Sequence, residues 1–214
     1  MPPTRITVLI SGSGTNLQAL INAISSSNLP NTTIVRVISN IKSAYGLTRA
    51  STASIPTHVF ALGAAFKASH AQFHSDDSAM RCAYDAELAS LLLADSPQLV
   101  VCAGWMRILS PAFLDPLAAR GVAIINLHPA LPGEYEGTRA IERAWGDFQQ
   151  GKITRTGVMI HYVIREVDAG QPLLTREVEI RKGERLEELM ERIHRVEHEA
   201  IVEGTRIAVE RLSG

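Results

Sequence analysis

The sequence predicts an α/β fold: a doubly wound, mostly parallel sheet with helices on both faces and an antiparallel addition near the C-terminal part. Three observations predict it. Strand-like and helix-like segments alternate along most of the chain. Two continuous apolar runs, 99–103 and 122–126, are typical of strands buried on both faces of a parallel sheet. Two later segments, 156–164 and 172–180, alternate more, and the turn 167–170 between them indicates an antiparallel pair.

The other elements follow from β-branched runs and from apolar residues at helical spacing. A first helix carries Leu17, Leu20, Ile21 and Ile24. No repeat, linker or break in composition divides the chain, so we expect a single domain over residues 1–214. The further strands are predicted at 5–10, 33–38 and 58–60, further helices at about 44–53, 76–94 and 184–211, and a loop or irregular insert at 63–77.

Composition excludes several classes of function. The 214 residues include 21 Lys and Arg against 22 Asp and Glu, a net charge of −1, so the chain has no basic surplus for a nucleic acid. Its apolar runs are far too short for a membrane span, and its first residues show no signal-peptide pattern. Cys82 and Cys102 form no paired motif, which favours a reducing compartment. We therefore expect a cytoplasmic protein.

A Gly-rich turn, residues 11–16, follows the first strand and opens the first helix. Glycines let backbone N–H groups approach an anion, and the helix N-terminus adds partial positive charge. The turn lacks the third glycine of a dinucleotide site and the lysine of a P-loop. It therefore fits a phosphate monoester, held by Gly14, Thr15 and Asn16, and it also fits an ordinary capped turn.

Asn126 is the last residue of the apolar run 122–126, and His128 follows two residues later, just before Pro129. Strand periodicity directs both side chains to one face, at the carboxyl edge where α/β sheets bind ligands. An amide can donate to an oxyanion, and an imidazole can move a proton near neutral pH. The alternative is a polar strand end that satisfies the loop backbone.

Two acids are further candidates. Asp168 lies two residues before Gly170, in a segment typical of a turn. Its carboxylate either serves only the turn or orients His128. Glu197 lies within the apolar stripe of the last helix, where a carboxylate needs a partner, either a ligand or an arginine. His194 lies at the edge of the same stripe.

The Trp105 loop, residues 103–109, follows the other buried strand. Its apolar side chains with Arg107 suit a flat heteroaromatic ligand with an acidic tail, and they equally suit an ordinary loop. Arg81 adds a second positive group on the preceding helix. The remaining histidines show no metal-ligand spacing, so we expect no metal. The chain also has no GxSxG motif, which argues against an acyl-enzyme hydrolase.

With these residues in place, nearly the whole chain resembles the phosphoribosylglycinamide formyltransferase family, in its fungal-type branch. The resemblance rests on the segments 9–18, 103–111, 126–129 and 161–170. Bacterial members have one more residue after the histidine, where this chain reads Pro129-Ala130-Leu131-Pro132, and they carry a small hydroxylated residue in place of Met159 and an amide in place of His194.

The resemblance implies an activity: transfer of the formyl group of 10-formyltetrahydrofolate to the amine of 5′-phosphoribosylglycinamide, in purine biosynthesis. It implies small-molecule substrates, and the chain would act as a monomer or homodimer. Residues to about 125 would bind the ribonucleotide phosphate, and residues from about 126 would hold the catalytic and folate-binding part. Alternatives are a 10-formyltetrahydrofolate hydrolase and a non-catalytic phosphometabolite-binding module. The roles implied are catalysis for Asn126, His128 and Asp168; ribonucleotide binding for Gly14, Thr15, Asn16, His194 and Glu197; and folate binding for Arg81, Met106, Arg107, Ile108, Leu109, Val163 and Val167.

Overall fold

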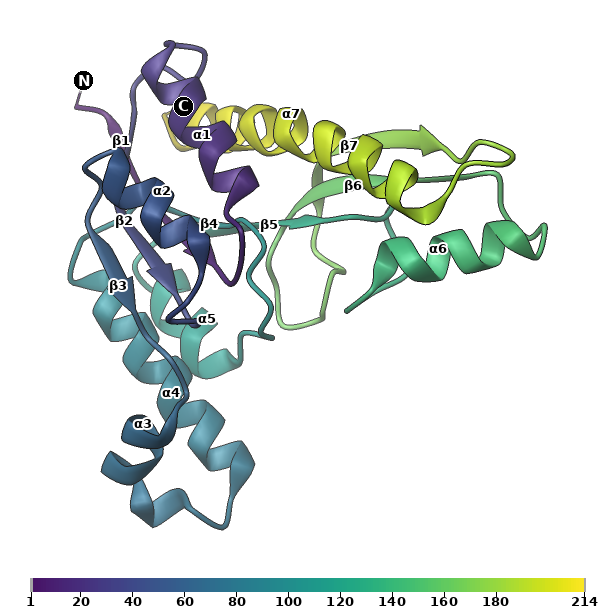
Figure 1. Ribbon diagram of the computed structural model, residues 1–214. Helices are drawn as coiled ribbons and strands as arrows, with labels where there is room; N and C mark the ends of the chain where they lie inside the picture. The colour runs from purple at the N-terminus through teal and green to yellow at the C-terminus, as the bar shows by residue number, and fades with distance from the viewer. Residues whose placement is uncertain (1, 214) are drawn as a thin grey trace. The chain divides into compact units, whose positions relative to one another are not determined.

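The computed structural model describes residues 2–213 (Figure 1). It divides into two compact units, Met1–Ile124 and Ile125–Gly214. Within the described residues, no helix has both the length and the apolar character needed to cross a membrane.

The first unit contains a parallel sheet in the order β3-β2-β1-β4. The chain moves from β1 outward to β2 and β3, and then returns to the other side of β1 as β4. Because parallel crossovers are right-handed, this reversal places helices on opposite faces of the sheet, as a doubly wound fold requires. The strands are β1 (Thr4–Ile10), β2 (Thr32–Ser39), β3 (Thr57–Val59) and β4 (Leu99–Cys102); the helices are α1 (Thr15–Ser25), α2 (Tyr45–Thr52), α3 (Ala64–Ser69), α4 (Asp77–Leu93) and α5 (Pro111–Ala118).

The central strands of this sheet are buried, as their apolar sequences predict, apart from Arg5 of β1. Val8 and Leu9 of β1 and Val100 and Val101 of β4 are all fully buried. All four paired strands run in the same direction, so their carboxyl ends share one edge. The Gly-rich turn and the Trp105 loop both leave from that edge.

The second unit is built on antiparallel strands. β5 (Ala123–His128) begins just before the division, and β6 (Arg155–Tyr162) pairs with it and with β7 (Pro172–Glu179). The predicted antiparallel addition is therefore confirmed. The long helix α7 (Leu186–Ser213) contacts β6 and β7, while α6 (Ala140–Gln149) contacts β6 and α7.

The prediction of a loop or irregular insert at residues 63–77 is wrong in part, because the segment contains α3 and a 3-10 turn, Ala71–Phe73. Its helical periodicity is weak because the segment packs mainly through Phe66, which meets the ring of Phe60 edge-on and stacks on His70. The sequence analysis also missed α5 and α6. Ser110-Pro111 is a helix-start signal for α5, and Ile141, Ala144, Trp145 and Phe148 form the apolar face of α6.

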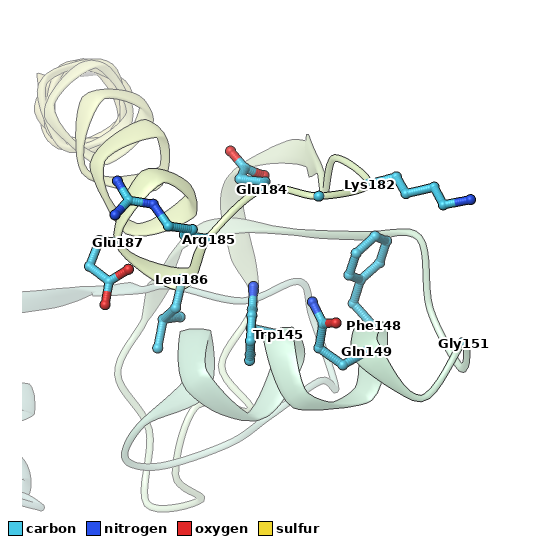
Figure 2. A pocket seen from close by; sticks show the side chains of 10 residues that line it. Trp145, Phe148, Gln149, Gly151, Lys182, Glu184, Arg185, Leu186 and Glu187 are labelled. Atoms are coloured by element: carbon cyan, nitrogen blue, oxygen red, sulfur yellow. The ribbon is translucent and has the colours of Figure 1, made fainter.

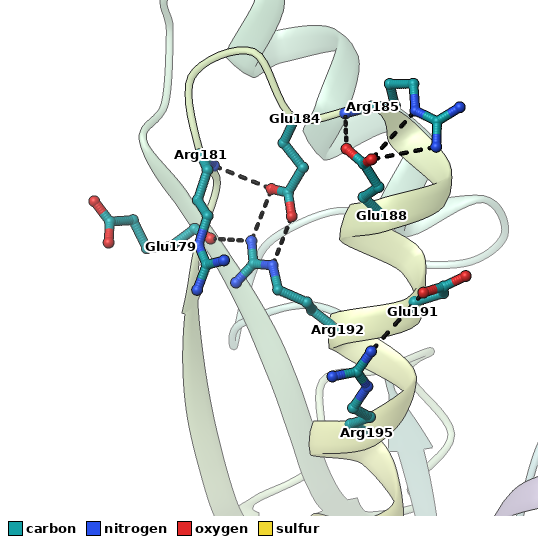
Figure 3. Close-up of polar contacts among 8 residues, drawn as sticks. All are labelled: Glu179, Arg181, Glu184, Arg185, Glu188, Glu191, Arg192 and Arg195. Carbon is teal, nitrogen blue, oxygen red and sulfur yellow. Dashed lines mark hydrogen bonds and ion pairs between the residues drawn. The ribbon is translucent and has the colours of Figure 1, made fainter.

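Charged side chains fix the loop between β7 and α7 (Figure 3). Arg192 Nε and Nη2 donate to the two carboxylate oxygens of Glu184 at 2.6 and 2.8 Å, and Nη2 also donates to the Glu179 carbonyl at 2.6 Å. Glu184 accepts a further bond from the Arg181 N–H at 3.1 Å. The Glu184 side chain is only 6% exposed and that of Arg192 is 21% exposed, so water screens this pair weakly.

Replacing Arg192 by Met is expected to lower the free energy of unfolding by about 2–3 kcal/mol, because it leaves the Glu184 carboxylate buried without its main partner. Urea unfolding measures this change. The control is Arg195→Met, which removes an exposed partner of Glu191 at 3.8 Å and is expected to cost less than about 0.5 kcal/mol. Equal losses in the two variants would contradict the structural role of Arg192.

Candidate active site

The Gly-rich turn is held from behind by α2. Gly14 has a φ of 71°, and a Cβ on it would lie 2.5 Å from Gly46 Cα. The Gly12 carbonyl accepts the Gly46 N–H at 3.1 Å, and the Ser13 carbonyl accepts Arg49 Nε at 2.9 Å. These bonds direct the two carbonyls toward α2. The first N–H groups of α1 have no side-chain cap from Gly14, which is the arrangement that binds an anion.

The Trp105 loop is anchored in the first unit and presents apolar side chains outward. Met106 and Ile108 are 74% and 67% exposed, whereas Leu109 is buried. The Arg107 guanidinium lies 4.6 Å above the centroid of the Tyr84 ring, a cation–π contact that fixes its direction. The loop therefore offers an exposed apolar surface beside an oriented cation. Leu109 belongs to the core behind this surface, and Arg81 is exposed on α4.

One carboxylate brings together the residues predicted for catalysis. Asp168 Oδ2 lies 3.4 Å from His128 Nδ1, and Asp168 Oδ1 accepts the Asn126 amide at 3.4 Å. The predicted facing of Asn126 and His128 on β5 is thus confirmed. His128 is 4% exposed, and its Nε2 has no hydrogen-bond partner among the described residues. Nδ1 faces the Asp168 carboxylate, so the two nitrogens of the ring lie in different surroundings.

The backbone around Asp168 is specialised. Asp168 has a φ of 52°, in the left-handed region that aspartate adopts more readily than most residues. Its Oδ2 accepts the Gly137 N–H at 2.8 Å. The carboxylate is thus held from the loop after β5 while it faces the two β5 side chains.

His161 is a fourth member that the sequence analysis did not select. It is 2% exposed and pairs with Asn126 in the β5–β6 register. Its Nδ1 lies 2.9 Å from the Tyr162 carbonyl, which places a proton on Nδ1, and its Nε2 lies 3.2 Å from the Asn126 amide nitrogen and 3.5 Å from Asp168 Oδ1. No local pattern marks His161, because its place beside Asn126 depends on the register of β6 against β5.

These contacts occupy both amide hydrogens of Asn126. One faces His161 and the other faces Asp168, the latter at the longer distance of 3.4 Å. The longer contact, to Asp168, is the weaker of the two.

Burial lowers the pKa of His128 below its ordinary value, although the Asp168 charge and the carbonyls of Glu134 and Tyr135 raise it in part. Burial raises the pKa of Asp168, but the His161 imidazole and the Gly137 N–H outweigh this effect, so it lies below its ordinary value. In the free protein, burial therefore outweighs the effect of the Asp168 charge on the His128 imidazole. The desolvated imidazole is neutral at neutral pH, beside an ionised carboxylate.

Stability is expected to fall as the pH drops below about 6.5, the ordinary histidine pKa, because the unfolded chain then binds a proton that folded His128 resists. Above that pH both states are neutral and the contribution vanishes. Urea unfolding of the wild-type protein and of His128→Gln, between pH 7.5 and pH 5.5, measures it. The wild-type protein should lose more stability over this range than the variant. Parallel curves would contradict the assignment.

The remaining predicted residues lie on α7 and in the loop after β6. Glu197 is 6% exposed, so its predicted position on the buried side of α7 is confirmed. His194, one turn earlier, is exposed. Val163 is half-buried, and Val167 is 37% exposed.

A separate groove of about 910 Å³ lies between α6 and the start of α7 (Figure 2). Its lining includes the Trp145 and Phe148 rings and the Leu186 side chain, with charged residues around them. No residue predicted for catalysis or for ligand binding lines it. In the described part of the chain, no group of three or more His, Cys, Asp or Glu residues is arranged to hold a metal ion.

Comparison with known proteins shows to which family the chain belongs. The family model described as formyl transferase matches residues 4–205. The chain belongs to the formyl transferase family. The phosphoribosylglycinamide formyltransferase of Schizosaccharomyces pombe is 48% identical over 200 residues, which cover 93% of this chain and 94% of that protein. The enzyme of the same name from Saccharomyces cerevisiae is 46% identical and covers 97% and 98%.

Other formyl transferases share less sequence but the same fold. The Escherichia coli phosphoribosylglycinamide formyltransferase is 37% identical, over 90% of this chain and 81% of that protein. The crystal structure of glycinamide ribonucleotide transformylase 1 from Symbiobacterium toebii aligns with a TM-score of 0.81 and 33% identity, over 97% and 88% of the two chains. The higher identity to the two fungal proteins agrees with the fungal-type resemblance.

Proposed function

We propose that this formyl transferase moves the formyl group of 10-formyltetrahydrofolate to the amine of 5′-phosphoribosylglycinamide, in purine biosynthesis. Both named fungal relatives are phosphoribosylglycinamide formyltransferases. The observation that carries the mechanism is the single carboxylate, Asp168, that contacts both His128 and Asn126. Together, these three side chains can stabilise the charges that form when an amine attacks a formyl carbon.

The proposed reaction begins with the neutral amine, whose pKa as an α-amino group is about 7.7–8.0. Its lone pair attacks the formyl carbon, and the carbonyl electrons move to oxygen. The Asn126 amide stabilises this oxyanion. Neutral His128 takes a proton from the new ammonium at Nε2 and delivers it to the folate nitrogen as the bond from carbon to that nitrogen breaks. Asp168 stabilises the imidazolium between the two transfers.

The other predicted residues are proposed to bind the two substrates. Gly14, Thr15 and Asn16 would hold the phosphate through N–H groups and short polar side chains. Glu197 and His194 would hold the ribose hydroxyls. The folate would contact an apolar and cationic set: Arg81, Met106, Arg107, Ile108, Leu109, Val163 and Val167. We propose that residues 1–214 work as one formyltransferase domain, with residues to about 125 for the phosphate and from about 126 for catalysis and folate. We further propose that it works in the cytoplasm, as a monomer or homodimer, without a metal.

A transfer assay with both substrates tests the proposal. Formation of formylglycinamide ribonucleotide that depends on 5′-phosphoribosylglycinamide supports it. Formate release that is indifferent to the ribonucleotide would instead indicate a 10-formyltetrahydrofolate hydrolase. Calorimetric binding of the ribonucleotide without turnover when the formyl folate is added would indicate a binding module.

A further inference from the structure

Ser11 joins two loops at the carboxyl edge of the parallel sheet. Its N–H donates to the Gly104 carbonyl at 3.0 Å. Its hydroxyl donates to Asn40 Oδ1 at 2.7 Å and accepts the Met106 N–H at 2.8 Å. Because a hydroxyl has one donor and two acceptor positions, both side-chain bonds form together. The segments that follow β1, β2 and β4 therefore meet at one side chain.

We propose that Ser11 is a positioning residue that couples the Gly-rich turn to the Trp105 loop, so that binding of one substrate changes the affinity for the other. The inference rests on the proposed function, which assigns the turn to the ribonucleotide and the loop to the folate. The Ser11 hydroxyl is committed to Asn40 and Met106, so it acts on the substrates through these neighbours.

Each loop is also anchored at a second point. In the Gly-rich turn, α2 holds the carbonyls of Gly12 and Ser13. In the Trp105 loop, buried Asp85 accepts the Ser110 N–H at 2.8 Å, just beyond the last loop residue. Because these anchors limit how each loop can move as a whole, a shift of one loop on binding is expected to strain or relax the bonds at Ser11. Removing the hydroxyl should therefore reduce the coupling between the two ligands more than it reduces the affinity for either ligand alone.

Calorimetry with 5′-phosphoribosylglycinamide and tetrahydrofolate, which together cannot react, measures this coupling. In the wild-type protein, saturating tetrahydrofolate is expected to change the Kd of the ribonucleotide by about fivefold or more. In Ser11→Ala the change should fall below about twofold, and Ser11→Thr, which keeps the hydroxyl, should restore it. Thermal unfolding checks that each variant is folded.

The control is Ser90→Ala, which removes a hydroxyl on α4 that bonds to the Ala86 carbonyl at 3.0 Å and should keep the wild-type coupling. If Ser11→Ala weakens both ligands but keeps their coupling, or if the wild-type protein binds both ligands without coupling, the inference is overturned. A wild-type protein that binds neither ligand overturns the proposed function, and this inference with it. A failure of the proposed function is distinguished from a failure of this inference because it is already seen in the wild-type protein.

Discussion

Replacing Asp168 by Asn is expected to lower turnover by at least about 100-fold, with the fold intact. The substitution keeps the size of the side chain but removes the charge that faces His128 at 3.4 Å. Without that charge, a buried imidazole cannot hold the proton it takes from the amine at acceptable cost. His128→Ala removes the proton carrier and Asn126→Ala removes an oxyanion donor, and each is also expected to cost about 10²–10³-fold. Steady-state formyl transfer measures all three.

The matched control is Glu203→Gln, which neutralises a half-exposed acid of the same unit that pairs with Arg176 at 2.6 Å. It should leave turnover unchanged. Circular dichroism and thermal unfolding separate a loss of chemistry from a loss of fold. A folded Asp168→Asn protein with wild-type turnover would remove this carboxylate from the mechanism, and the same reasoning applies to the other two residues.

Replacing Gly170 by Ala is expected to lower both turnover and stability. A Cβ at this position would lie 1.6 Å from the Tyr162 carbonyl oxygen, which is backbone and cannot rotate away. The turn must therefore move, and Asp168 lies only two residues earlier. We expect a loss of about 2–3 kcal/mol in the free energy of unfolding and at least about 100-fold in turnover. Urea unfolding and the transfer assay measure the two effects.

Gly146→Ala is the control for this prediction. A Cβ on Gly146 meets nothing within 4 Å, and the residue lies within α6, where alanine favours the helix. This variant should keep wild-type turnover and gain slightly in stability. A Gly170→Ala protein with wild-type turnover would show that the Asp168 turn is not held as the structure describes. If the variant does not accumulate in folded form, the packing part of the prediction stands and Asp168→Asn tests the chemistry.

The sequence predicted most strands and helices of this protein because their signals are local. Apolar runs mark β4 and β5, and the last strands show their antiparallel pairing in the short turn between them. It could also predict that Asn126 and His128 share a face, because strand alternation decides that. Residues 63–77 were misjudged because Phe66 packs against two rings that lie outside the segment, Phe60 and Tyr84.

Other features of the candidate site depend on tertiary contacts that no local pattern encodes. His161 joins the cluster only through the register of β6 against β5. The lowered pKa of His128 follows from its burial, which outweighs the nearby Asp168 charge and which the sequence does not show. The Asn126 amide lies between His161 and Asp168 only because these residues, from different segments, are brought to the end of β5.

The approach of Gly14 to Gly46 restricts how this protein can diversify. A Cβ on Gly14 would meet the main chain of Gly46 at 2.5 Å, and a Cβ on Gly46 would meet Ile10 Cδ1 at 2.5 Å and Gly14 Cα at 3.1 Å, so neither glycine has room for a side chain. Selection for a different phosphorylated ligand would have to act instead at Ser13, which is exposed, and at Thr15, which is half-buried. A library randomised at those two positions, with both glycines kept, is the rational starting point for changing the acceptor.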